Sequence, residues 1–118
     1  MNYLPFRILD KAALRHLGLW ELHWELHAYL DNCYYNEVRL LNVGRRMLRH
    51  FLLAELVNLY LHRWGTTEYI ELQLHKALQV TEEKLFWVAP DLEQWCIVFK
   101  ATERGEHYSP ETMMPDFR

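Results

Sequence analysis

Apolar and polar residues in the first third of the chain repeat with a period of four. Residues 20–27 read Trp-Glu-Leu-His-Trp-Glu-Leu-His. Because four residues are close to one turn of an α-helix, equivalent side chains of the two copies lie on the same stripe of the helix. The pattern predicts a helix that follows Asp10 as its N-cap and continues to about Leu30. Tryptophans, glutamates, leucines and histidines would each occupy a separate stripe.

Four further helices are predicted from apolar periodicity and from capping residues. The second helix is the longest and runs from the N-cap Asn36 to about Trp64, with Gly65 in the left-handed position beyond its end. The other three are expected over residues 66–79, 81–89 and 90–104. Residues 70–75 also alternate like a half-buried strand, but the threonines that precede them are good N-caps and favour a helix.

The fold predicted from these elements is all-α, with about five helices dominated by a long antiparallel helical hairpin. In this hairpin Glu21 and Glu25 would reach Arg45 and Arg49, and Gly44 would let a neighbouring helix approach closely. The alternative is an α+β fold with a short strand pair formed by residues 3–9 and 94–101. It rests on the strand-forming residues of the second segment.

Length and composition indicate one folded unit. The chain has 118 residues, of which 51% are hydrophobic and 14% aromatic, and only four are glycine and four proline. We expect a single helical domain over residues 1–105 and a flexible C-terminal tail over residues 106–118. Met113, Met114 and Phe117 of this tail would either dock on a partner or be disordered. The aromatic content is high for one small core and indicates an interface.

Charge is distributed unevenly along the chain. Its net charge is −3, but residues 36–65 contain five arginines against two glutamates, a local charge of +3. The exposed side of the second predicted helix holds Arg39, Arg46, Arg49 and His50. This side is either a stripe that binds phosphate or acidic groups or an ordinary solvated face. Because the whole chain is acidic, nucleic acid is not expected as a partner. The basic segment would pair with the acidic C-terminal half of the same chain, with a second copy or with another protein.

Several classes of protein are disfavoured by what the sequence lacks. No nucleophile motif, glycine-rich phosphate loop or zinc-binding cysteine pattern is present, so we expect neither an enzyme nor a cofactor. The two cysteines, Cys33 and Cys96, are far apart. The longest apolar run is interrupted by polar residues and is too short to span a bilayer. These features predict a cytoplasmic protein with reduced thiols and no membrane association.

The function predicted from these features is protein binding. The chain is expected to be a small non-enzymatic module, an adaptor, chaperone-like or inhibitor protein, that binds another protein and forms a homodimer. Aromatic residues and arginine concentrate binding energy at protein interfaces. The residues expected to contact the partner are Trp20, Trp24, Tyr34, Tyr35, Arg46 and Arg49.

Two other functions stay open. The first is metal binding by His23 and His27, which are one helical turn apart, with Glu55 and His62 of the second predicted helix completing the site. The second is a DNA-binding regulator, because residues 74–89 resemble a degenerate helix-turn-helix. In this segment Gln79 occupies the position usually taken by glycine. The second helix of the motif would begin Thr-Glu-Glu, which places negative charge where DNA would lie.

Overall fold

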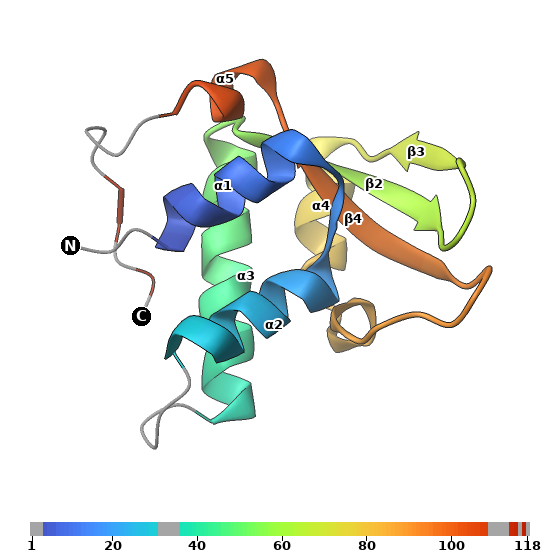
Figure 1. Ribbon diagram of the computed structural model, residues 1–118, viewed down its shortest axis with the longest axis horizontal. Coiled ribbons are helices and arrows are strands. Elements are labelled where there is room, and N and C mark those ends of the chain that lie inside the picture. The colour runs from blue at the N-terminus through green and yellow to red at the C-terminus, as the bar shows by residue number, and fades with distance from the viewer. Residues whose placement is uncertain (1–3, 31–35, 109–113, 116, 118) are drawn as a thin grey trace.

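The computed structural model describes residues 4–30, 36–108, 114, 115 and 117. Helices and strands alternate along the chain (Figure 1). The elements are α1 (Leu4–Leu14), β1 (Leu17–Gly18), α2 (Leu19–Leu30), α3 (Glu37–Leu53), β2 (Val57–Arg63), β3 (Tyr69–Glu71), α4 (Leu74–Val80), the 3-10 helix η1 (Lys84–Trp87), β4 (Trp95–Ala101) and α5 (Glu103–Glu106). Tyr34 and Tyr35, two of the predicted contact residues, lie outside the described residues.

The all-α prediction is wrong, because the strands form an antiparallel sheet with the order β1-β4-β2-β3. The chain is therefore an α+β protein and not a helical bundle. The alternative placed a strand at residues 94–101, and β4 lies there. Its partner differs, because residues 4–14 form α1 and β4 pairs with β1 and β2 instead. Leu59 lies opposite Phe99, and both side chains are fully buried.

The first predicted helix is divided into α1 and α2 by a short extended segment, and its predicted N-cap is wrong because Asp10 lies inside α1. Gly18 lies in this segment, and a β-carbon added to it would come within 2.3 Å of the Trp20 ring, so the close turn into α2 requires glycine. The Gly18 amide donates to Glu21 Oε1 at 3.2 Å, which satisfies an amide ahead of the new helix. The helical pattern of the sequence therefore continues through this segment, although the helix itself does not.

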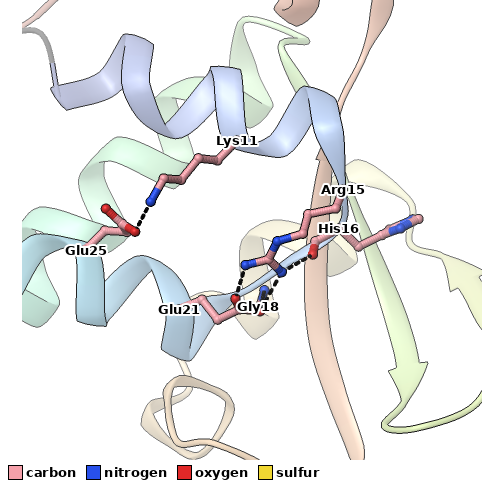
Figure 2. Close-up of polar contacts among 6 residues, drawn as sticks. All are labelled: Lys11, Arg15, His16, Gly18, Glu21 and Glu25. Carbon is pink, nitrogen blue, oxygen red and sulfur yellow. Dashed lines mark hydrogen bonds and ion pairs between the residues drawn. The ribbon is translucent and has the colours of Figure 1, made fainter.

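Cations of α1 hold both glutamates of the repeat (Figure 2). Lys11 pairs with Glu25, and Arg15 pairs with Glu21. Arg15 also donates to the His16 carbonyl at 3.1 Å. The predicted pairing of these glutamates with the arginines of the second helix is therefore wrong. Two ion pairs instead fix α1 against α2.

The second predicted helix ends eleven residues earlier than expected, at Leu53. Ala54 is its C-cap, and Glu55 adopts a left-handed backbone with φ of 60°. The chain then becomes β2, in which Val57 and Leu59 are buried. Because an apolar stripe can also be formed by alternate residues of a strand, the periodicity did not show that the helix stops.

The later helices are also shorter than predicted. Residues 69–71 form β3, so the strand alternation was the better indicator there, and α4 begins at Leu74. The helix expected over residues 90–104 is β4 followed by the single turn α5. Thr102 caps α5, because its hydroxyl oxygen accepts from the Gly105 amide at 3.1 Å.

Helix α3 lies at the centre of the molecule, with α1 and α2 crossing it and the sheet beside them (Figure 1). The largest fully buried side chains come from every layer and include Phe51 of α3 and Phe99 of β4. A smaller cluster covers the other face of the sheet, where Trp20 packs on Cys96 and Val98. Phe117 is also buried in the main core. No helix in the described part of the chain has the length and apolar character needed to cross a membrane.

Candidate nucleic-acid interface

Helices α2 and α3 follow each other with residues 31–36 between them and pack together (Figure 1). Asn36 is the N-cap of α3, and its side-chain oxygen accepts from the Arg39 amide at 2.9 Å. Gly44 lies where the helices meet, since an added β-carbon would be 3.1 Å from Leu26 of α2 and 2.9 Å from Trp87. The close contacts at Gly44 are thus made by side chains, whereas the sequence predicted the approach of a helix backbone. The antiparallel strands β2 and β3 follow α3 directly.

The solvent-facing stripe of α3 is basic. Arg39, Asn42, Arg46 and Arg49 are spaced by three or four residues, so they share one face, and the three arginines are exposed. The whole helix contains four arginines and one acidic residue, Glu37. Its other face is buried in the core. The buried residues of α3 are Leu40, Leu41, Val43, Gly44, Met47, Leu48, Phe51 and Leu52.

Two arginines of α3 donate hydrogen bonds to backbone carbonyls, which do not neutralise their charge. Arg45 donates to the Glu82 carbonyl at 2.7 Å, and Arg46 donates to the Phe117 carbonyl through Nε at 3.2 Å and Nη2 at 2.8 Å. A carbonyl oxygen accepts a hydrogen bond but carries no net charge, so both guanidinium groups stay positive. Arg49 makes no hydrogen bond or ion pair within the described part of the chain. Arg49, which is exposed, is therefore available to an anionic partner.

A group of metal-binding side chains lies where α2 meets the start of α3. The rings of His23 and His27 are edge-to-face with centroids 4.9 Å apart, as their spacing on one helical stripe predicts. Glu37, the first residue of α3, accepts from both, with Oε2 at 2.9 Å from His23 Nε2 and Oε1 at 2.6 Å from His27 Nε2. One ligand atom from each residue lies within 4.8 Å of the other two.

Hydrogen bonds from the two histidines favour the ionised form of Glu37. The bond from His23, together with that from His27, lowers the pKa of Glu37, so its carboxylate is ionised at neutral pH. His23 Nδ1 is buried and has no partner among the described residues. Nε2 is therefore the nitrogen through which His23 meets other polar groups.

A pocket of about 400 Å³ opens beside this group. Its walls are mainly apolar. The lining residues are His23, Trp24, Glu37, Val38, Leu41, Lys84, Trp87, Val88 and Ala89. The buried Trp87 ring is held in place because its Nε1 donates to the Thr81 carbonyl at 2.9 Å. The pocket thus joins the histidine–glutamate group to a hydrophobic surface.

The predicted partner-binding residues are placed in different environments. Trp24 is 58% exposed at the pocket, whereas Trp20 is only 3% exposed and covers the sheet. Arg46 and Arg49 lie together on the basic stripe of α3. These two arginines are the predicted contact residues that lie on one common surface.

The two residues expected to complete a metal site with His23 and His27 lie elsewhere. Glu55 follows α3 and forms an exposed ion pair with Arg104 at 3.7 Å. His62 is on β2, where its ring stacks on Tyr69 with centroids 4.1 Å apart. The side chain that the structure places against both histidines is Glu37, which was not predicted from the sequence. Its position directly after the N-cap Asn36 was the available signal, because it places a carboxylate at the junction of two helices.

The helix-turn-helix predicted over residues 74–89 is not formed as expected. α4 is followed by η1, which has four residues. A single 3-10 turn is too short to act as a recognition helix. The two longer helices that follow each other in the described chain and pack together are α2 and α3. We compared the chain with protein-family models, curated proteins and solved structures, and none of them matches it.

Proposed function

We propose that this chain is a DNA-binding protein of the winged helix-turn-helix class, in which α3 enters the major groove. One observation carries the proposal: α3, the second of two packed helices, presents a basic stripe, and Arg49 on this stripe has no hydrogen bond or ion pair among the described residues. In such proteins the helix after the turn contacts base edges, and arginine binds both phosphates and guanine. The net charge of −3 argues against long-range attraction to DNA, but the three exposed arginines of α3 concentrate positive charge where contact would occur.

The acidic residue of α3 lies close to the stripe that would contact DNA. Glu37 is the first residue of the helix, and its ionised carboxylate accepts from His23 and His27 of α2. These hydrogen bonds orient the carboxylate toward α2 but do not remove its charge, so Glu37 weakens the attraction of this end of α3 for phosphate. Arg39, Arg46 and Arg49 lie on the exposed stripe.

The test is binding of a fluorescent random-sequence DNA duplex, measured by anisotropy over a range of salt concentrations. The matched variants are Arg49→Gln and Arg104→Gln, which each remove one exposed positive charge, the second on α5. We expect binding that weakens linearly in log salt. Arg49→Gln should lower affinity about 5- to 150-fold if it reads a base, or reduce the salt slope by about one if it contacts phosphate. Arg104→Gln should bind like the wild type.

No binding at low salt would refute the proposal. An equal loss in both variants would also refute it, because it would mean that only net charge matters. Circular dichroism of both variants establishes that each is folded. Selection of tight-binding duplexes from the random pool then identifies the preferred sequence.

Protein binding is the second candidate function, and it is favoured by the apolar surface around the pocket. Trp24 and Val38, which is 67% exposed, lie at the pocket with Val88. The partner would be a second copy or another cytoplasmic protein, and the activity non-enzymatic. Sedimentation equilibrium of wild type and Trp24→Ser tests the homodimer: a concentration-dependent dimer that the substitution weakens supports it, and a monomer at all concentrations opposes it.

A further inference from the structure

We propose that His23, His27 and Glu37 bind a divalent transition-metal ion, zinc or a similar ion, which joins α2 to the start of α3. The metal would then act as an effector of the helix that we propose to bind DNA. The metal site itself rests on these three side chains alone, and only its regulatory effect rests on the proposed function.

The ligand types define the class of ion. Two imidazole nitrogens and one carboxylate oxygen form a set used by zinc, whereas magnesium and calcium prefer oxygen ligands alone. Ligand atoms around tetrahedral zinc lie about 3.3 Å apart, as follows from metal–ligand distances near 2.05 Å. The separations of Glu37 oxygens from the imidazole nitrogens, 2.9 Å and 2.6 Å, are less than 1 Å shorter. The Glu37 side chain is 70% exposed, so it is free to move outward by this amount.

The helices bring the three ligands together before any ion binds. His23 and His27 are fixed by their spacing on α2, and their Nε2 atoms already point toward the same carboxylate. Glu37 is fixed by the N-capped first turn of α3. Three protein ligands leave one tetrahedral position for water or another donor, and the adjoining pocket of about 400 Å³ has room for it.

The position of the site links it to α3. A metal ion bound by residues of both helices stabilises the observed packing of α2 against α3. The basic stripe begins at Arg39, two residues after the ligand Glu37. If the ion favours the DNA-binding arrangement, then DNA must increase metal affinity by the same factor, because coupling between two binding equilibria is reciprocal.

The experiment uses metal alone as the first probe. Cobalt(II) is titrated into the full chain, its visible absorption is recorded, and zinc(II) is then added in competition. Zinc affinity is measured by calorimetry for wild type, His27→Ala, Glu37→Gln and the control His75→Ala, which removes an exposed histidine of α4. We expect one ion per chain, a tetrahedral cobalt spectrum, and at least about a tenfold loss of affinity in both ligand variants. His75→Ala should match the wild type.

Several results would overturn the assignment. These are the absence of stoichiometric binding, or a wild-type affinity in both Glu37→Gln and His27→Ala. Melting temperatures without metal show whether each variant is folded. Glu37→Gln retains hydrogen-bonding groups at the site, so it provides a folded variant if His27→Ala is unstable.

A second measurement separates the regulatory effect from the proposed function. The affinity for the random-sequence duplex is measured with and without zinc in the wild type and in Glu37→Gln. A zinc-dependent change of at least about fivefold in the wild type alone supports the inference. Zinc binding without any DNA binding would leave the metal site intact and refute the DNA-binding function. DNA binding that zinc does not alter would refute the effector role only.

Discussion

Replacing Gly105 by alanine tests whether α5 is pressed against the end of α3 as closely as the structure shows. A β-carbon added at Gly105 would lie 2.0 Å from the Leu56 carbonyl oxygen and 3.0 Å from its carbonyl carbon. Ordinary contact between a carbon and an oxygen requires more than 3 Å. The backbone of Leu56 or of α5 must therefore move by about 1 Å, because no flexible side chain can absorb the clash.

Two opposing effects decide the sign of the change in unfolding free energy. Alanine favours a helix over glycine by about 1 kcal/mol, and α5, with a single turn, would gain less than this. Overpacking costs about 1–3 kcal/mol. The movement also weakens the bond from the Thr102 amide to the Leu56 carbonyl, 2.9 Å long, which contributes about 1 kcal/mol. The net expectation is a destabilisation of about 2–3 kcal/mol.

Urea denaturation followed by tryptophan fluorescence measures this change. The control is Glu106→Ala in the same helix, which changes an exposed residue and should alter the unfolding free energy by less than about 0.5 kcal/mol. A Gly105→Ala protein as stable as the control, or more stable, would show that helix propensity dominates. The close packing of α5 on Leu56 would then be refuted.

Three further predictions concern strain, pH and thiol reactivity. Glu55→Gly should raise the unfolding free energy by about 1 kcal/mol in urea denaturation, because glycine relieves the left-handed strain at φ of 60°. The exposed ion pair with Arg104 that is lost contributes little. A lower stability of the variant would contradict this prediction. Burial lowers the pKa of His16 and of His50 below the ordinary value of 6.5, so the unfolded chain binds more protons than the folded one. The melting temperature should therefore fall as pH is lowered through 6.5. A melting temperature that rises on acidification would contradict the expected direction. Burial, aided by the charge of Glu21, raises the pKa of the Cys96 thiol to about 11, so mass spectrometry should find it unalkylated by iodoacetamide at neutral pH until the chain is unfolded.

The helical part of the fold was predictable where local signals agree. The repeat at residues 20–27 correctly indicated a helix, and its histidine stripe correctly paired His23 with His27. Asn36 was correctly identified as the N-cap of α3. These features depend on residues within one or two turns of each other, which is the range over which helical periodicity acts.

The sheet was not predictable with the same reasoning, because its strands depend on distant partners. β2 continues the apolar pattern of α3, and its longest pairing is with β4, about forty residues away. The third metal-binding candidate was missed for a related reason. Glu37 is close in sequence to its histidines, but its role depends on how α3 crosses α2. That crossing is a tertiary feature.

The basic stripe was recognised from the sequence, but its use was assigned differently. Arg46 and Arg49 were expected to bind a protein, because arginine concentrates binding energy at protein interfaces and the whole chain is acidic. The structure shows that these arginines lie on the second of two packed helices. The interpretation of these arginines changes because α2, α3 and the strands β2 and β3 follow one another in the chain, and not because of the net charge.

Phe117 places a constraint on how the end of this chain can evolve. Terminal residues generally tolerate substitution, since they contribute few buried contacts. Here the ring is buried beside His50, and the carbonyl of the same residue receives two hydrogen bonds from Arg46. Orthologous sequences should therefore vary freely at neighbouring exposed positions while retaining a large apolar side chain at Phe117. Drift at this one position would disturb an arginine seventy-one residues away in the chain.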